Sequence, residues 1–371
     1  MIKKLQDTIN SKRKDVEKWF SKQYASISKK KLPLPIYSSF DLRDSGSKAA
    51  IVDSNLFPAG FNNISGAAKD KAVAGFKKYI KANLKGKAVL IVPEAHTRNL
   101  YYLSNLCSLK RLLTSAGFTV VIGHMQEEEV LELKDSKGHT VILEKIKRKG
   151  NSVYTKSFNK GFILLNNDFS VGNPPLLDGL GQTIIPPLFL GWAHRKKSTH
   201  CRFFDTLLED FTSTLKIDAW LLQAYCDVVN NVDFRKKGTL EDVAAAVDRM
   251  LSKIQLKYDE YGIESSPYVF VKDNSGTYGM GILSVHSGSE ILNLNSDKRR
   301  KMVFGKDKSQ INSVMIQEGV ETSHTVEGGA AEPVLYSVGG KVIGGFMRIN
   351  PKQSSKVNLN APGAKFDALL E

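Results

Sequence analysis

The sequence predicts an α/β protein whose C-terminal part is α+β, and three observations lead to this prediction. Short runs rich in Val, Ile and Leu alternate with helical patterns through the first half of the chain. A Pro- and Gly-rich passage near residues 173–192 then interrupts the alternation and marks a boundary. Beyond it come two helical patterns followed by a series of strands.

The first half is expected to form a largely parallel sheet covered by helices. Helical patterns at residues 66–84 and 97–116 separate the first three apolar runs. Strands that alternate with helices favour parallel pairing with both faces covered. The runs predicted to be strands are AAIVDSN, KAVLIVPE, FTVVIGH, HTVILEK and GFILLNND.

The second half is expected to contain helices around residues 202–231 and 239–261, followed by strands. We therefore divide the chain into a basic helix with its connector at 1–35, an α/β domain at 36–190 and a second domain at 191–371. The strands predicted in the second domain are PYVFVKD, GILSVH, VMIQEGV, EPVLYSVG and KVIGGFMRIN.

Composition indicates a folded protein with room for one large or two medium cores. The chain has 371 residues, of which 42% are hydrophobic, and no 18 uncharged apolar residues run together. It is expected to be soluble and cytoplasmic. Its cysteines, Cys107, Cys201 and Cys226, are odd in number and widely spaced. We expect neither a disulfide framework nor a CxxC site, in keeping with a reducing compartment.

The formal net charge of +15 leaves nucleic acid open as a partner. Residues 1–31 contain ten Lys or Arg and three acidic residues, so this arm alone contributes +7. Its helical spacing favours a solvated amphipathic helix. The sequence has no helix-turn-helix, RNP-like strand or zinc-finger spacing, and a protein that handles ATP also gains from a positive field. Small-molecule substrates are therefore the expected partners, with no nucleic acid or membrane; the oligomeric state stays open.

A glycine-rich segment follows the strand YVFVK, which ends on Lys272. Backbone approaches phosphate oxygens closely only where side chains are absent, and free amides in succession bind anions. The segment is either a phosphate-covering loop with Lys272 beside the phosphates, or a hairpin with an exposed lysine at its base. It is neither GxxxxGK[ST] nor GxGxxG. The first interpretation predicts contacts with ATP from Lys272, Ser275, Gly276, Thr277, Tyr278, Gly279, Met280 and Gly281.

Two later segments support ATP chemistry. The strand VMIQEGVET ends in Gln317, Glu318 and Val320, which we expect to present backbone groups to an adenine edge. Glu332 heads an otherwise apolar strand and is expected at a sheet margin, where a carboxylate binds Mg²⁺. An ordinary strand end and a solvated glutamate remain the alternatives.

The segment GGFMRINPKQSSKVNLNAPG places Arg348 and Asn350 two residues apart, on one side of a strand. Arg348 is expected to hold a transferring phosphoryl group, and Asn350 to bind metal through its carbonyl oxygen. Asn358 is a further candidate metal ligand, although Asn before Pro and Gly is commonly a turn residue.

Polar residues cluster after the first strands, where α/β proteins usually bind ligands. Arg and carboxylate side chains suit the two charged ends of an amino acid, while capping and turn roles are the alternative. Lys197 is expected to be a second phosphate contact; a zinc site at His194, His200 and Cys201 fits no common spacing. The candidate substrate contacts are Asp41, Arg43, Asp53, Asn55, Asn62, Asn63, His96 and Arg98.

The order of these motifs resembles that of the ATP-grasp superfamily, and their amino-acid sequences resemble those of the proteobacterial type of glutamate-cysteine ligase. The resemblance covers roughly residues 36–366, and VDSNLFPAGFNN and DNSGTYGMGI are its most specific parts. It implies a pre-ATP-grasp domain followed by an ATP-grasp domain, which join L-glutamate to L-cysteine with ATP and Mg²⁺ through an acyl phosphate. Lys272 and Arg348 are then the expected catalytic residues.

One feature departs from that pattern. Many ATP-grasp ligases carry a late Glu-x-Asn strand that completes the metal site, and none follows NLNAPG in this sequence. Either Arg348-Ile349-Asn350 takes its place or the C-terminus is abbreviated. A ligase for another substrate pair, such as glutathione synthetase, is the alternative within the superfamily.

Overall fold

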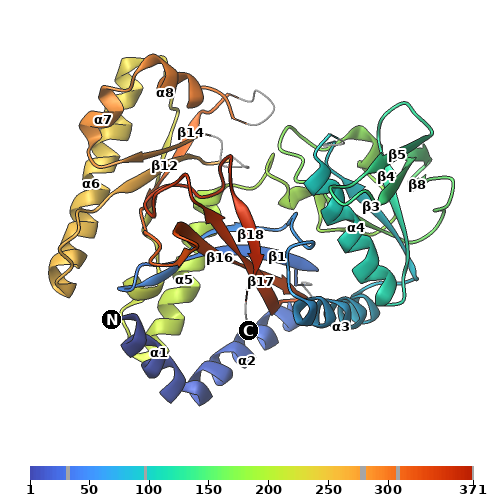
Figure 1. Cartoon of the computed structure of the whole chain (residues 1–371), viewed down its shortest axis with the longest axis horizontal. Coiled ribbons are helices and arrows are strands. Elements are labelled where there is room, and N and C mark those ends of the chain that lie inside the picture. The colour runs from blue at the N-terminus through green and yellow to red at the C-terminus, as the bar shows by residue number, and fades with distance from the viewer. Residues whose placement is uncertain (31–33, 96–97, 276–280, 306–309, 370–371) are drawn as a thin grey trace.

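The computed structural model describes residues 1–30, 34–95, 98–275, 281–305 and 310–369. Three main sheets are arranged side by side, with one sheet in the centre and the other two flanking it (Figure 1). A short hairpin of β7 (Lys147–Lys149) and β8 (Ser152–Tyr154) lies beside them.

The central sheet is antiparallel and joins residues from both ends of the chain. Its order is β18-β17-β16-β1-β2, with β15 paired to β16. The strand β1 runs antiparallel to β16, so that Asp41 lies opposite Val334. The strands are β1 (Tyr37–Asp44), β2 (Ala49–Asn55), β15 (Thr325–Val326), β16 (Gly329–Val338), β17 (Lys341–Asn350) and β18 (Lys365–Ala368).

The second sheet is largely parallel, as predicted. Its order is β10-β9-β3-β4-β6-β5, and only β5 pairs antiparallel. The helices α3 (Gly66–Asn83) and α4 (Leu100–Ser115) confirm the two helical patterns expected there. The strands are β3 (Ala88–Pro93), β4 (Thr119–His124), β5 (Val130–Lys134), β6 (Thr140–Lys145), β9 (Phe162–Asn166) and β10 (Ile184–Ile185).

The third sheet is antiparallel, in the order β11-β14-β12-β13, and packs against the long helix α6 (Lys237–Tyr261). Small helices follow at α7 (Gly288–Leu292) and α8 (Ser296–Lys301). The strands are β11 (Cys226–Asn230), β12 (Val269–Asp273), β13 (Ile282–Val285) and β14 (Ser313–Glu318). Single turns of 3-10 helix occur at Pro175–Leu177, Leu188–Leu190 and Ala219–Leu222.

The predicted boundary at residue 190 does not separate the sheets. The run AAIVDSN forms β2, and it belongs with β1 to the sheet built by the C-terminal strands instead of the parallel sheet. The helix expected at 202–231 is also shorter than predicted. It is α5 (Lys197–Leu215), which ends at Lys216 in the left-handed conformation, φ 53°, and residues 226–230 form a strand.

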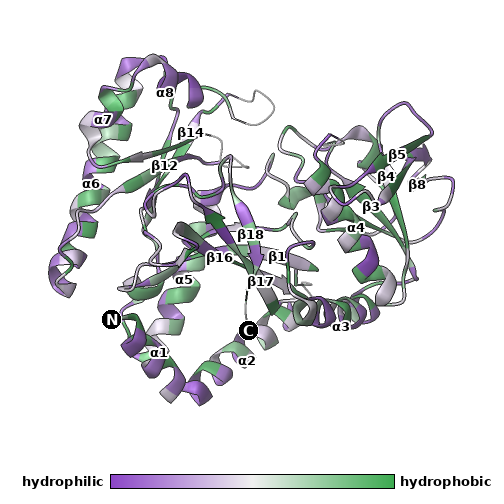
Figure 2. Cartoon of the chain, in the orientation of Figure 1, coloured by the Kyte–Doolittle hydropathy of each residue, from purple (hydrophilic) through white to green (hydrophobic). Residues whose placement is uncertain are grey.

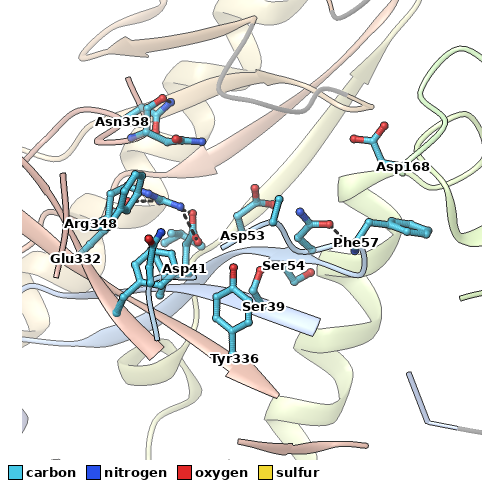
Figure 3. A pocket seen from close by; sticks show the side chains of 18 of the residues that line it. Ser39, Asp41, Asp53, Ser54, Phe57, Asp168, Glu332, Tyr336, Arg348 and Asn358 are labelled. Atoms are coloured by element: carbon cyan, nitrogen blue, oxygen red, sulfur yellow. Dashed lines mark hydrogen bonds and ion pairs between the residues drawn. The ribbon is translucent and has the colours of Figure 1, made fainter. Parts of the chain in front are cut away.

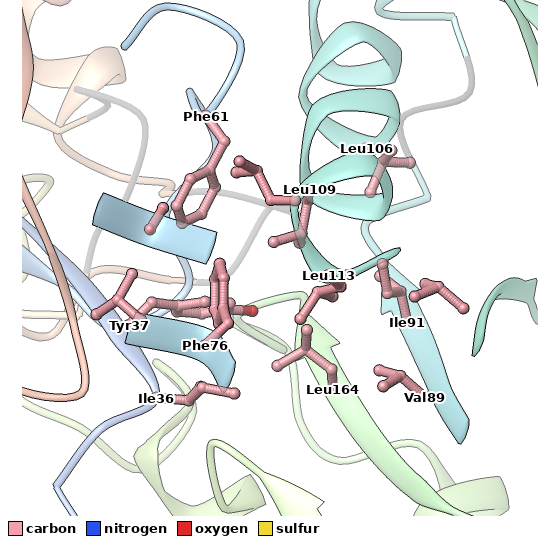
Figure 4. Packing of buried hydrophobic residues seen from close by; sticks show 14 of the residues in the cluster. Ile36, Tyr37, Phe61, Phe76, Val89, Ile91, Leu106, Leu109, Leu113 and Leu164 are labelled. Carbon is pink, nitrogen blue, oxygen red and sulfur yellow. The ribbon is translucent and has the colours of Figure 1, made fainter. Parts of the chain in front are cut away.

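One apolar cluster joins the central sheet to the parallel sheet. Tyr37 and Phe61 pack against Phe76 of α3, and the leucines of α4 continue the cluster to Ile91 of β3 (Figure 4). Colouring by hydropathy shows the inner strands as apolar and the outer helix surfaces as polar (Figure 2). The helix α3 therefore covers the apolar end of one face of the central sheet.

The basic N-terminal arm forms α1 (Ile2–Ser11) and α2 (Arg13–Lys29), which are mostly exposed, as expected of a solvated amphipathic pair. It is nevertheless packed on the body of the molecule. Trp19 Nε1 donates to Asp210 of α5 at 2.7 Å, and its ring lies against Phe211. In the part of the chain that the structure describes, no helix has the length and apolar character to cross a membrane.

A buried ion pair joins the central sheet to the third sheet. Lys48, in the turn between β1 and β2, lies 2.8 Å from Glu318 of β14, and the two side chains are only 3% and 0% exposed. The same carboxylate accepts hydrogen bonds from Trp220 Nε1 and the Tyr225 amide. Each charge is thus fully paired where solvent does not reach it.

Replacing one partner of this pair is expected to destabilise the protein. Lys48→Met leaves the Glu318 carboxylate buried without its cation, which costs about 3–5 kcal/mol of unfolding free energy. Urea denaturation measures the loss. Arg13→Met, which removes an exposed pair with Glu17, serves as the control and should leave the midpoint unchanged. If Lys48→Met shifted the midpoint as little as Arg13→Met does, the buried ion pair would not contribute to stability as we expect.

Candidate active site

A cavity of about 370 Å³ opens over one face of the central sheet. Alternation along the strands explains which residues face it, because every second side chain points to the same side. The sheet residues on this face that line the cavity are Ser39, Asp41, Arg43, Asp53, Asn55, Glu332, Val334, Tyr336, Phe346, Arg348 and Phe366.

The same face changes from apolar to polar along each strand. On β16 it passes from Val338, in the apolar cluster under α3, through Tyr336 to Glu332. On the antiparallel neighbour β1 it passes from Tyr37 to Arg43. The polar ends of the strands coincide because the strands are antiparallel, and the cavity lies beyond α3, where the face is polar.

Four charged side chains form a continuous chain on the cavity floor. Arg348 Nη1 lies 2.7 Å from Asp41 and 2.6 Å from Glu332, between the two carboxylates (Figure 3). Arg43 Nε donates to the other oxygen of Glu332 at 2.7 Å. Burial raises the pKa of Glu332, but the two guanidinium groups outweigh it and hold the pKa below its usual value. Burial raises the pKa of Asp41, and its ion pair with Arg348 opposes this, so the floor sets two guanidinium groups against two carboxyl groups.

The remaining donors of the two arginines differ. Arg43 donates to the backbone oxygens of Val320, Ser355 and Val357, so its guanidinium is fully engaged. The Nε of Arg348 is buried and has no partner among the described residues. Since a buried donor without a partner is costly, Arg348 is less completely satisfied by the described residues than Arg43.

Two lysines, Lys197 of α5 and Lys272 of β12, also line the cavity, and we call this part of the lining the wall. Lys197 Nζ lies 2.7 Å from Asp53 Oδ1, and Lys272 Nζ donates to Gln317 Oε1 at 2.5 Å. Burial lowers the pKa of Lys272 to about 8, although nearby Asp53 opposes this. Burial alone would raise the pKa of Asp53, but Lys197 and Lys272 lower it to about 2. Asp53 is therefore ionised at neutral pH and offsets one of the two lysine charges, while Asp168 and Asp273 add two more carboxyl groups to the cavity lining.

Asn350 supports the cavity indirectly. It is fully buried at the end of β17, and its Nδ2 donates to the backbone oxygens of Leu359 and Ala361. Its Oδ1 accepts from the Lys352 amide. These bonds hold the segment that places Asn358 and Asn360 on the cavity. Asn350 itself does not line it.

The structure brings most of the predicted side chains together. Every predicted substrate contact from β1, β2 and the following loop lines the cavity, as do the two lysines and Arg348. Arg98 is exposed and does not line it. Predictions on His96, Gly276, Thr277, Tyr278, Gly279 and Met280 lie outside the described residues.

The remaining nucleotide contacts predicted do not line the cavity. The Glu318 amide donates to the Tyr225 oxygen and the Val320 oxygen accepts from Arg43, so these two backbone groups are already bonded within the protein. Gln317 binds Lys272 instead. Ser275 Oγ accepts from Lys196, and the Gly281 oxygen accepts from the Asp273 amide.

The position expected for Glu332 is wrong. Its strand, β16, lies between β1 and β17, so Glu332 is inside the sheet and 2% exposed instead of at a margin. Both carboxylate oxygens already accept from guanidinium groups. With Asn350 covered by the following segment, the three predicted metal ligands, Glu332, Asn350 and Asn358, do not converge as one ligand set.

Several cavity residues were not predicted. Ser39 and Tyr336 lie two and four residues from predicted ones on the same strands, so alternation alone would have found them. Phe57, Asp168 and Trp192 come from loops. The Trp192 ring lies 4.9 Å from Lys197 Nζ, a contact between segments that no local pattern signals.

The expectation of separate cysteines is wrong for two of the three. Cys201 of α5 and Cys226 of β11 form a disulfide and are 25 positions apart in sequence. Cys107 is free. Pairing across 25 positions depends on how α5 packs against β11, which spacing in the sequence does not reveal.

Comparison with known proteins gives one strong match. The glutamate-cysteine ligase family model matches residues 6–371. The chain belongs to the glutamate-cysteine ligase family. Ligases of this family join glutamate to cysteine with ATP, so the chain is a ligase that acts on small-molecule substrates.

A solved structure supports this assignment. It is a protein from Methylobacillus flagellatus KT whose description as a gamma-glutamylcysteine synthetase is provisional; it is 37% identical, with a TM-score of 0.90 over 99% of this chain and 86% of that one. No curated protein matches the sequence.

Two other solved structures are much more distant. D-alanyl-alanine synthetase A from Vibrio cholerae O1 biovar eltor is 13% identical, with a TM-score of 0.34 over 72% of this chain and 68% of that one. A glutathione synthetase-like effector from Globodera pallida is 11% identical, with a TM-score of 0.40 over 90% and 75%. Likeness at this level carries no further argument.

Glu332 of the ligase is expected to stabilise the fold without any metal ion. Glu332→Gln removes the anion shared by Arg43 and Arg348 and should lower the unfolding free energy by about 3–5 kcal/mol in EDTA. Urea denaturation checks this. Asn358→Ala, at another predicted metal ligand, should change it little. A loss confined to Mg²⁺-containing buffer would instead assign Glu332 to a metal site.

Proposed function

We propose that this ligase uses ATP to activate the γ-carboxylate of L-glutamate as an acyl phosphate, and that the amine of L-cysteine then displaces the phosphate. The observation that carries the proposal is a cavity whose lining holds the cations of Lys197, Lys272 and Arg348 in fixed positions, beside carboxylates and the Gln317 side chain. Phosphoryl transfer depends mainly on positioning and charge neutralisation, and this cavity supplies both.

The two lysines are the proposed phosphate contacts. Lys272 and Lys197 face the cavity from different elements, β12 and α5, and are largely buried. Arg348 lines the same cavity, and its guanidinium is already oriented by Asp41 and Glu332. Groups fixed in advance stabilise developing charge without reorganising, so we assign Lys272 and Arg348 the catalytic roles.

Polar groups of the first two strands are the proposed amino-acid contacts. Asp41 and Asp53 present carboxylates to the cavity and suit the ammonium group of an amino acid. The amides of Asn62 and Asn63 line it from the following loop. Asp53 stays ionised at neutral pH. Burial alone would raise the pKa of Asp53, but Lys197 and Lys272 outweigh burial and lower this pKa to about 2.

The metal ion implied for such chemistry has no ligand set among the predicted residues. Glu332 lines the cavity, but both its oxygens are held by guanidinium groups, and Asn350 is covered, so Asn358 is the one predicted ligand on the cavity that has no guanidinium partner. Mg²⁺ stays a prediction, and no step is derived through it. The division into pre-ATP-grasp and ATP-grasp domains is likewise a proposal, supported by the parallel sheet and by the separate sheet that carries Lys272.

The reaction is tested by product formation from defined substrates. The ligase incubated with ATP, Mg²⁺, L-glutamate and L-cysteine should release phosphate and form γ-glutamylcysteine, identified by mass spectrometry. Omitting either amino acid is the control. Phosphate release that ignores cysteine but needs γ-glutamylcysteine and glycine would assign glutathione synthetase chemistry instead.

Lys272 should also give the reaction a characteristic pH dependence. Below about pH 8 its amine is protonated, and above that value the positive charge is lost. We therefore expect kcat/KM for ATP to fall as pH rises through about 8. In Lys272→Met this fall should be absent and kcat/KM lower by about 100-fold or more.

A matched variant tests the assignment. Lys196→Met removes a neighbouring lysine that bonds Ser275 and does not line the cavity, so it should keep the wild-type pH profile. If Lys272→Met retains wild-type kcat/KM, the phosphates are not bound beside Lys272.

A further inference from the structure

The disulfide lies beside the cavity, between two elements that contribute to it. Cys201 is one turn after the N-terminus of α5, and Cys226 is the first residue of β11. Both side chains are half-buried, within reach of a small reagent. Their Cα atoms are 6.9 Å apart.

On the helix side, the bond fixes the turn that carries Lys197. Lys197 and Cys201 are four residues apart and lie on the same side of α5. Lys197 pairs with Asp53, and His200 Nε2 lies 2.9 Å from Ser54 Oγ. The N-terminal turn of α5 therefore contacts β2 directly above the cavity.

On the strand side, the disulfide fixes β11 beside Gln317, the residue whose side chain accepts a hydrogen bond from Lys272. Cys226 lies opposite Gln317 in the pairing of β11 with β14. The Gln317 side chain in turn accepts from Lys272 Nζ. The disulfide thus links the supports of the two lysines that form the wall.

The other bonds at this end of α5 are non-covalent. The Lys197 amide donates to the Asn274 backbone oxygen at 2.8 Å, and the Ser198 amide donates to its side-chain oxygen at 2.9 Å. A second cavity, of about 30 Å³, adjoins the first and is lined by Cys201, Asp205 and Lys197 among others. Incomplete packing here gives the turn room to move once the sulfur atoms separate.

We propose that Cys201 and Cys226 form a reversible thiol-disulfide site, and that its oxidation by a low-molecular-weight disulfide fixes Lys197 and Lys272 at the spacing that ATP requires. The effect on ATP rests on the proposed function, whereas formation of the bond does not. Oxidation then favours the nucleotide-binding form of the ligase, and reduction loosens the turn of α5.

The chemistry balances with the small disulfide as the oxidant. One protein thiolate attacks it, its sulfur-sulfur bond breaks and one small thiolate leaves, giving a mixed disulfide. The second protein thiolate attacks the protein sulfur of that mixed disulfide and releases the other small thiolate. Two electrons pass from the protein to the oxidant, and the two protons of the cysteines end on the two small thiols.

The pair can complete this exchange, whereas Cys107 has no second thiol with which to do so. Asp205 Oδ2 lies 3.7 Å from Cys201 Sγ and 4.0 Å from Cys226 Sγ, and a carboxylate this close disfavours the thiolate, so the exchange should become faster as the pH rises. Burial raises the pKa of Cys107, and no second cysteine lies beside it. Cys107 therefore serves as the matched control.

The first measurement does not depend on ligase activity. The full chain is reduced, desalted, incubated with glutathione disulfide and desalted again, and free thiols are counted. We expect three thiols before oxidation and one after, with a peptide containing Cys201 joined to one containing Cys226. Hydrogen exchange of the amides at 197–201 should be slower in the oxidised form. Three thiols after oxidation would overturn the site.

The second measurement tests the consequence for ATP. KM for ATP should be about fivefold higher or more in the reduced protein and in Cys226→Ser than in the oxidised wild type. Cys107→Ser should respond to oxidation as the wild type does. Equal KM in the two redox states of an active ligase would overturn the coupling.

Tight Zn²⁺ binding by the reduced protein, lost in Cys226→Ser, with no disulfide formed on oxidation, would replace the proposal with a metal site at Cys201, Asp205 and Cys226.

Discussion

The chain of buried charges from Asp41 through Arg348 and Glu332 to Arg43 is the constraint on which the rest of the site depends. Charges removed from water are costly unless each is paired and its remaining hydrogen-bonding groups are satisfied. The backbone oxygens of three later residues satisfy Arg43, so the loops beyond β14 and β17 must fold over the sheet. The pairing that neutralises the floor therefore also positions the segment that closes one side of the cavity.

The distribution of charge separates the floor from the wall. On the floor, Arg43 and Arg348 pair with Asp41 and Glu332, whereas on the wall Lys197 and Lys272 lie beside Asp53, and Asp168 and Asp273 also line the cavity. The overall charge of +15 is spread over the chain, and much of it lies on the exposed N-terminal helices. The proposed phosphate contacts therefore depend on the positions of individual cations and not on the net charge.

The three sheets are joined by a few specific contacts as well as by apolar packing. Lys48 and Glu318 connect the central sheet to the sheet that carries Lys272, and α3 connects it to the parallel sheet through one shared core. The disulfide adds a covalent link between α5 and β11. The residues proposed to bind the substrates thus come from separate elements whose relative positions these contacts maintain.

Local pattern in the sequence determined most of the elements and many of the site residues. The density of polar residues near the first strands singled out Asp41 and Arg43, and the residues of the motifs identified the family. Local pattern could not show that Asn350 would be covered or that Glu332 would lie inside a sheet, because alternation gives the side of a strand and not its neighbours. Those neighbours, like the pairing of β1 with β16 and of Cys201 with Cys226, come from distant parts of the chain. Only the tertiary structure decided them, since strand register and burial depend on contacts that no short segment contains.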